Sequence, residues 1–94
     1  MDLKHKMLHR DLTIINYNTN GLKRQSFELQ KLLQEKKIDI ACITETHLKP
    51  SVKLKIKNYL IYRNDREERY GGGTAILIKS TIPHRPAPTP RLNV

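Results

Sequence analysis

The chain has 94 residues, with 18 lysines and arginines against 9 aspartates and glutamates, giving a formal net charge of +9. This length allows one domain or part of one, with a thin hydrophobic core. No stretch approaches the roughly 20 apolar residues of a membrane-spanning helix, so we expect no membrane partner. Cys42 is the single cysteine, which excludes a disulfide framework and favours a reducing, intracellular compartment.

The positive charge is concentrated in the second half of the chain. Residues 1–47 carry eight basic and six acidic groups, whereas residues 48–94 carry ten and three. A basic half favours a polyanionic partner, most simply nucleic acid. The solubility of a small lysine-rich protein would explain the same charge equally well.

A polar lead over 1–10 is predicted to be disordered. A strand is predicted over 11–17, and Asn20-Gly21 has the chemistry of a turn. Residues 23–36 follow as an amphipathic helix, because four leucines recur at helical spacing on one face. These are Leu22, Leu29, Leu32 and Leu33.

A second strand is predicted over 38–43. Its apolar residues are nearly continuous, which is typical of a strand buried on both faces, with Cys42 as a buried thiol. Strand, helix and strand in this order form a βαβ unit with parallel strands. The fold class is therefore predicted to be α/β.

The second half contains two further strand candidates, at 59–62 and 74–78. Residues 47–58 are ambiguous: alternating apolar residues and lysines suit a half-exposed strand, whereas Pro50 and the lysines suit a solvated loop. The three glycines at 71–73 precede a strand instead of opening a helix, so a tight turn is favoured over a phosphate cradle. Four prolines between 83 and 90 predict an extended end over 83–94.

Polar side chains follow both strands of the predicted βαβ unit. The first strand ends in Asn16, Asn18 and Asn20, and the second is followed by Glu45 and His47. Ligands of open α/β sheets bind at the carboxyl ends of strands, and Mg²⁺ prefers oxygen ligands such as carboxylates and carbonyls. A magnesium site is one interpretation. Asparagines are also ordinary turn formers, and Glu45 is also interpretable as the first exposed residue after a buried strand.

The order of these motifs resembles one family. "INYNTNGL", a helix, "IDIACITETHL" and then "YLIYRNDREERYGGGTAILIK" resemble the endonuclease/exonuclease/phosphatase superfamily. More closely, they resemble the apurinic-type endonuclease domain of non-LTR retrotransposon polyproteins of the jockey type. The resemblance covers about residues 10–94. It implies a two-sheet α/β sandwich, of which 11–94 would be a truncated N-terminal portion, with a reverse transcriptase downstream in the parent.

The resemblance also implies roles for individual residues. Asn18 and Glu45 match the family's ligands of Mg²⁺, with Mn²⁺ as an alternative ion, and Asn20 lies near the metal. His47 matches a basic residue of the metal-site network or a phosphate contact. Tyr17 replaces the family's common tryptophan and retains an aromatic ring. Four positions fall along the DNA backbone path: Lys23, Arg24, Arg69 and Tyr70.

The family's later motifs, an Asp-x-Asn pair and a Ser-Asp-His element, do not occur in this chain. No aspartate follows Asp65, and His84 has no preceding Ser-Asp. We therefore expect a fragment of a nuclear, Mg²⁺-dependent DNA endonuclease that is inactive in isolation and lacks the C-terminal part of its own domain. The alternative is a small basic nucleic-acid-binding or interaction protein. Its contact surface would be the charged stretch 47–69, with Tyr59, Tyr62 and Tyr70 among the basic residues.

Overall fold

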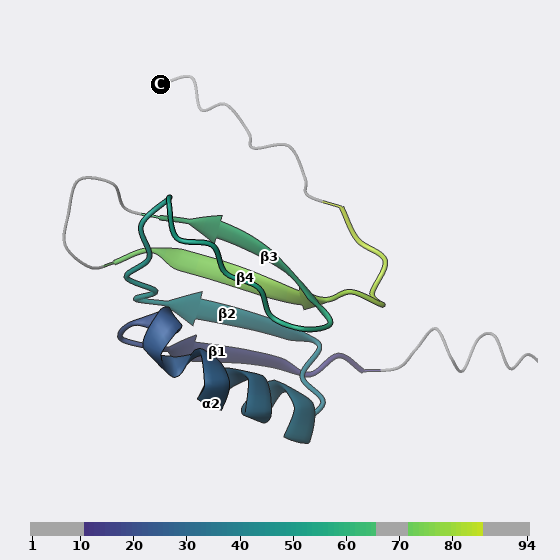
Figure 1. The fold of residues 1–94 in the computed structure, drawn as a ribbon. Helices are drawn as coiled ribbons and strands as arrows, with labels where there is room; N and C mark the ends of the chain where they lie inside the picture. The colour runs from purple at the N-terminus through teal and green to yellow at the C-terminus, as the bar shows by residue number, and fades with distance from the viewer. Residues whose placement is uncertain (1–10, 66–71, 86–94) are drawn as a thin grey trace, which may run out of the picture.

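The computed structural model describes residues 11–65 and 72–85. They form one four-stranded sheet with a single helix packed on it (Figure 1). The elements, in chain order, are β1 (Ile14–Asn18), α2 (Leu22–Glu35), β2 (Ile40–Thr44), β3 (Tyr59–Asn64) and β4 (Thr74–Lys79). The predicted disordered lead at 1–10 and most of the proline-rich end, 86–94, lie outside the described residues.

The sheet is mixed, with the strand order β1-β2-β4-β3. β1 and β2 are parallel and joined through α2, which confirms the predicted βαβ unit. β4 runs antiparallel to both β2 and β3. The carboxyl ends of β1, β2 and β3 therefore lie at the same edge of the sheet as the start of β4.

Helix α2 covers β1 and β2 through its leucine face. Leu22, Leu29 and Leu33 are fully buried, as their spacing predicted. Phe27 lies on the far side of the helix and is 75% exposed. Within the described part of the chain, no helix is long and apolar enough to cross a membrane.

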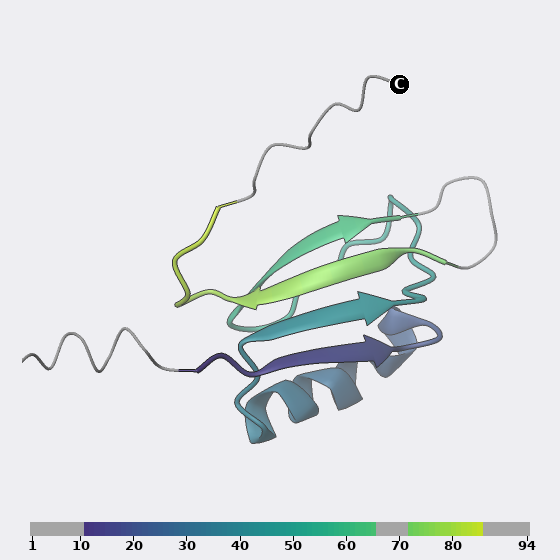
Figure 2. The same ribbon diagram turned by 180° about the vertical axis from the view of Figure 1, so that it is seen from behind.

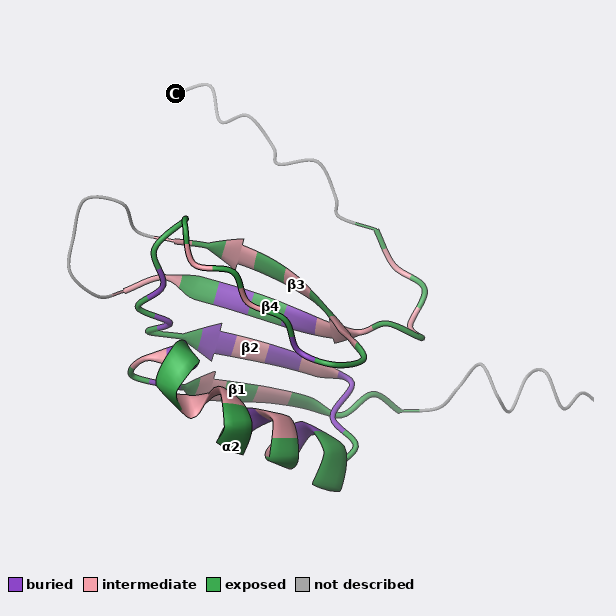
Figure 3. Ribbon diagram, viewed as in Figure 1, coloured by how far each residue is buried: buried purple, intermediate pink, exposed green. Residues whose placement is uncertain are grey.

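The segment from 45 to 58 covers the other half of the same sheet face, over β4 and β3 (Figure 1). It forms no strand, so the loop interpretation is correct, yet its apolar residues are not solvated. Leu48 and Ile56 are buried, and Val52 and Leu54 pack against the core. The alternation over 52–57 thus reflects a loop that lies on the sheet and directs every second side chain toward the core (Figure 3).

The opposite face of the sheet is open among the described residues (Figure 2). Ile40 and Cys42 of β2 point to it and are only partly buried, so the prediction of a strand buried on both faces is wrong here. The reason is that α2 and the loop both lie on one side. The register aligns two rows across this face: Ile14, Ile40, Ile78 and Leu60, then Asn16, Cys42, Ile76 and Tyr62.

Tyr59 makes the free energy of unfolding depend on pH in the alkaline range. Its hydroxyl donates a hydrogen bond to the carbonyl of Ile38. Burial raises the pKa of Tyr59 above its ordinary value of 10.0, and the carboxylate of Asp39 raises it further. Folding therefore favours the neutral phenol. This contribution to stability is complete below the unfolded-state pKa and is lost as the pH rises through the folded-state pKa.

We expect Tyr59→Phe to flatten the fall in unfolding free energy above about pH 10, measured by urea denaturation. Tyr62→Phe removes the same hydroxyl from the open face and is the matched control. Equal flattening by both variants would contradict this assignment.

Candidate metal and phosphate site

The polar edge of the sheet is formed by the carboxyl ends of the two parallel strands. In the last row of the sheet, Asn18 pairs with Thr44, Thr44 with Thr74, and Thr74 with Asn64. The two rows before it are mostly apolar. The sequence thus changes from apolar to polar at one end of the sheet, where ligands of open α/β sheets bind.

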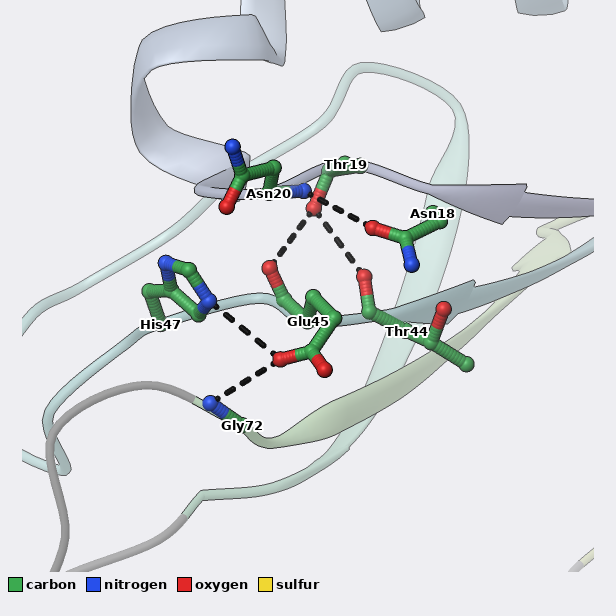
Figure 4. A network of polar contacts seen from close by, with 7 residues as sticks. All are labelled: Asn18, Thr19, Asn20, Thr44, Glu45, His47 and Gly72. Carbon is green, nitrogen blue, oxygen red and sulfur yellow. Dashed lines mark hydrogen bonds and ion pairs between the residues drawn. The ribbon is translucent and has the colours of Figure 1, made fainter.

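Thr19 connects the segment after β1 to the end of β2 through hydrogen bonds. The residue is only 2% exposed. Its backbone N–H donates to the carbonyl of Thr44 at 3.1 Å, and its hydroxyl lies 3.2 Å from that carbonyl and 3.1 Å from the carbonyl of Glu45. The N–H of Gly21 donates to the same Glu45 carbonyl at 2.8 Å. These bonds hold Glu45 beside the asparagine segment, as Figure 4 shows.

The carboxylate of Glu45 lies between two donors (Figure 4). Its Oε2 accepts from the backbone N–H of Gly72 at 3.1 Å and lies 3.3 Å from Nε2 of His47. The side chain is 46% exposed. Oε1 has no hydrogen-bond partner among the described residues, so one carboxylate oxygen remains available at this edge.

The position of Asn18 is consistent with both interpretations made from the sequence, turn formation and a metal site. Its Oδ1 accepts the backbone N–H of Asn20 at 3.2 Å, which is the Asx turn that asparagine commonly forms. The same side chain lies at the edge beside the Glu45 segment (Figure 4). Asn16 lies two rows further back, opposite Cys42, and so is set away from this edge.

Backbone conformations at this edge are unusual. Asn20, Glu45 and His47 have φ values of 46°, 54° and 55°, in the left-handed region that non-glycine residues rarely adopt. Such conformations persist where the surrounding structure enforces them, and they cluster at functional sites. Here the enforcing contacts include the hydrogen bonds of Thr19 and Gly72.

The residues present fit a magnesium ion. No three His, Cys, Asp or Glu side chains converge anywhere in 11–65 or 72–85, so these residues provide no cage made wholly of such ligands. Mg²⁺ does not need one, because it keeps several waters and is commonly bound by one or two carboxylates together with phosphate. The free oxygen of Glu45 and the amide oxygen of Asn18 form that kind of partial ligand set.

Two of the four residues predicted on the DNA path lie near this edge. Lys23 and Arg24 are exposed in the first turn of α2, next to Leu22, whose N–H donates to the carbonyl of Thr46 at 2.8 Å. The other two, Arg69 and Tyr70, lie outside the described residues.

Sequence reasoning missed the residues that position Glu45. Thr19 and Thr46 are buried, and Gly72 supplies an N–H donor to the carboxylate. Gly72 and Gly73 have positive φ values of 76° and 89°, which suit the predicted tight turn, and Gly71 lies outside the described residues. Thr19 stands among the asparagines of the first motif, but only the fold shows that its hydroxyl turns inward.

The two tyrosines of the alternative contact surface that the structure describes, Tyr59 and Tyr62, do not lie on one surface. Tyr59 and Tyr62 are three residues apart on β3, so their side chains lie on opposite faces of the sheet. Tyr59 is bonded to Ile38, whereas the hydroxyl of Tyr62 lies 3.0 Å from Nε2 of His84 on the open face.

The chain is similar in sequence to RNA-directed DNA polymerases of mobile elements. It is 35% identical over 81 residues to the RNA-directed DNA polymerase from mobile element jockey of Drosophila melanogaster, covering 85% of this chain and 9% of that protein. It is 32% identical over 78 residues to the probable RNA-directed DNA polymerase from transposon BS of the same species, covering 80% of this chain and 9% of the relative. The chain thus spans about a tenth of these relatives.

Solved structures with a similar fold include AP endonucleases and a 3′ phosphatase. An AP endonuclease from Archaeoglobus fulgidus matches with a TM-score of 0.65 at 22% identity, over 72% of this chain and 27% of that one. The 3′ phosphatase NExo from Neisseria, solved with a product DNA hairpin, matches with a TM-score of 0.64 at 21% identity, over 72% and 27%. The profile of the endonuclease/exonuclease/phosphatase family matches residues 15–93, and the chain belongs to that family.

Proposed function

We propose that this chain is the N-terminal part of a Mg²⁺-dependent DNA endonuclease domain, with Mn²⁺ as an alternative ion. In the parent protein the domain would nick target DNA in the nucleus for a downstream reverse transcriptase. Two findings support this proposal: membership of the nuclease family and similarity to polyproteins named as RNA-directed DNA polymerases.

One observation carries the proposal. The amide of Asn18 and the carboxylate of Glu45 come from the carboxyl ends of neighbouring parallel strands, at one edge of the sheet. The chain around them is fixed by the buried hydroxyl of Thr19 and by the backbone N–H of Gly72. Ordinary turn formation explains the asparagines, but it does not explain a half-exposed carboxylate held in a left-handed backbone conformation.

Each residue has a distinct part in this proposal. Glu45 and Asn18 would hold the ion, which when bound polarises a phosphate oxygen. The N–H of Gly72 and the ring of His47 orient the Glu45 carboxylate, leaving its second oxygen free. Lys23 and Arg24 would contact the DNA backbone as cations beside the edge.

The proposal includes inactivity of the isolated chain. Glu45 and His47 pair with each other at the edge, and no third His, Cys, Asp or Glu side chain joins them among the described residues to activate a water. The chain spans 27% of the solved AP endonuclease from Archaeoglobus fulgidus. We expect no nicking of supercoiled plasmid by this chain in Mg²⁺ or Mn²⁺. Metal-dependent nicking that Glu45→Gln abolishes would contradict the proposed inactivity.

The metal site itself is testable by NMR. We expect Mn²⁺ to broaden the amide resonances of Asn18, Glu45 and Gly72 selectively, with Mg²⁺ competing. Glu45→Gln should weaken the binding by more than the roughly 10–100-fold that loss of an outer-shell partner costs. Glu28→Gln, an exposed glutamate on α2, is the matched control. Equal weakening by both variants, or broadening spread over all acidic residues, would contradict a site at this edge.

A further inference from the structure

Lysines form an exposed row on the loop that covers β3 and β4. Lys49, Lys53, Lys55 and Lys57 are exposed, while the apolar residues between the last three point into the core. No acidic residue occurs from 47 to 64. Burial alternates residue by residue over 52–57, as in an extended chain (Figure 3). The three lysines of that stretch therefore project on the same side, about 6.5 Å apart, twice the rise of an extended residue.

The backbone that carries this row is fixed by hydrogen bonds. Arg63 donates from Nη1 to the carbonyl of Val52 at 2.6 Å and from Nη2 to the carbonyl of Lys49 at 2.9 Å. Its guanidinium also pairs with the nearly buried carboxylate of Asp65 at 2.6 Å. At the other end, the N–H of Tyr59 donates to the carbonyl of Ile56 at 3.2 Å. The lysine stems thus leave a defined backbone, which lowers the ordering cost of binding.

An open groove of about 380 Å³ runs between this loop and β3, which is an edge strand. Two lysines of the row, Lys55 and Lys57, form part of its wall. The rest is mainly apolar and aromatic: Leu54, Ile56, Tyr59, Leu60 and Ile61. A polyanion with flat, unstacked bases binds where cations lie beside an apolar groove.

The groove and the Lys57 end of the row lie away from the Glu45 edge. The other end begins closer to this edge, because the carbonyl of Lys49 is bonded to Arg63, the neighbour of Asn64. Lys57 comes just before Tyr59, at the end of β3 that pairs with Lys79, whereas Asn64 at the other end belongs to the polar row. The two ends of β3 are five residue steps apart, about 17 Å. A ligand in this groove therefore does not have to occupy the proposed metal site.

We propose that the lysine row and its groove bind single-stranded nucleic acid. Adjacent phosphates of one strand are separated by nearly the same distance as Lys53, Lys55 and Lys57, so each lysine would face one phosphate. Unstacked bases would lie against the apolar groove wall. A duplex offers the same phosphates but keeps its base faces stacked, so it would use the lysines alone. This binding is additional to the proposed cleavage and does not depend on it.

Solvation alone does not account for this pattern. The exposed side of α2 mixes signs, because Glu28 and Glu35 stand among its lysines and Arg24. Mixed charges are usual for a surface that only maintains solubility. The loop instead places three lysines on one side, and no described residue forms an ion pair with any of them.

The test compares two triple variants that remove the same charge. One carries Lys53→Gln, Lys55→Gln and Lys57→Gln. The control carries Lys31→Gln, Lys36→Gln and Lys37→Gln, on and just after α2. Binding of a fluorescein-labelled 15-mer of oligothymidine is measured by anisotropy in EDTA across a salt series. We expect the loop variant to lower the slope of log K against log salt by about 2, and the control to change it little.

Three results would overturn the proposal. The first is equal weakening by both triple variants, which would show that only net charge matters. The second is equal binding of a 15-base-pair duplex and the single strand, which would exclude a role for the groove wall. The third is competition by polyglutamate as strong as that by unlabelled oligothymidine, which would favour an acidic protein segment. Circular dichroism melts of both variants confirm that each remains folded.

Discussion

Replacing Gly73 with alanine is expected to lower the free energy of unfolding by about 3 kcal/mol. A Cβ at this position would lie 2.5 Å from Oγ1 of Thr46, closer than real contacts allow. Overpacking of this kind costs about 1–3 kcal/mol. The φ of Gly73 is +89°, so a side chain adds backbone strain of about 1–2 kcal/mol. Thermal and urea denaturation of the variant measure the loss.

A second substitution, at Thr46, tests whether the steric contact causes this loss. Thr46 is 1% exposed, and its hydroxyl has no hydrogen-bond partner in the described structure. Thr46→Ala removes an unsatisfied buried group, so we expect it to be nearly neutral. Combined with Gly73→Ala, it should recover the steric part of the loss and leave the backbone part. Strict additivity of the two variants would show that the contact is not the cause.

Backbone hydrogen bonds connect Gly73 to the Glu45 edge, so Gly73→Ala should also affect that edge. The carbonyl of Gly73 accepts the N–H of Thr46 at 3.3 Å, and the carbonyl of Gly72 accepts the N–H of His47 at 2.8 Å. The N–H of Gly72 in turn holds Glu45. Displacing Gly72 and Gly73 should therefore also alter the environment of the Glu45 side chain. The amide resonance of Gly72 in the folded variant reports this change.

Most of the fold could be predicted from local patterns. The leucine spacing placed α2 within one residue at each end, and the polar residues after 38–43 marked the end of β2. Parallel pairing followed from the βαβ order. The prediction that β2 is buried on both faces was wrong for the described residues. A run of apolar residues indicates that both faces of a strand avoid water, but it does not show what covers them. In β2 only Ala41 and Ile43 are covered by the core.

The candidate site could be predicted only in part, for a related reason. Asn18 and Glu45 carry recognisable chemistry and follow strands, so the topology brings them together. The positioning contacts involve threonine hydroxyls and glycine N–H groups, which are common everywhere in proteins. Their role depends on left-handed backbone angles at Glu45 and His47. No propensity rule predicts these angles for such residues, because tertiary contacts impose them.

The open face of the sheet leads to the second large expected effect, on self-association. Leu60, Ile76 and Tyr62 are 45%, 44% and 40% exposed there, and Ile14 is 56% exposed. The family resemblance implied two packed sheets, whereas the described residues form one. An apolar sheet face of this kind promotes association, so we expect the chain to associate reversibly as its concentration rises, measured by sedimentation equilibrium.

Ile76→Lys should weaken this association roughly a hundredfold, because a buried, unpaired charge in the contact would cost about 3 kcal/mol. Ile76 lies in the middle of β4 beside Cys42 and Tyr62, at the centre of the face. Phe27→Lys adds the same charge at an exposed apolar residue of α2 and is the matched control. If Phe27→Lys weakens association as much, repulsion between basic chains explains the result. If only Ile76→Lys does so, the contact is the open face of the sheet.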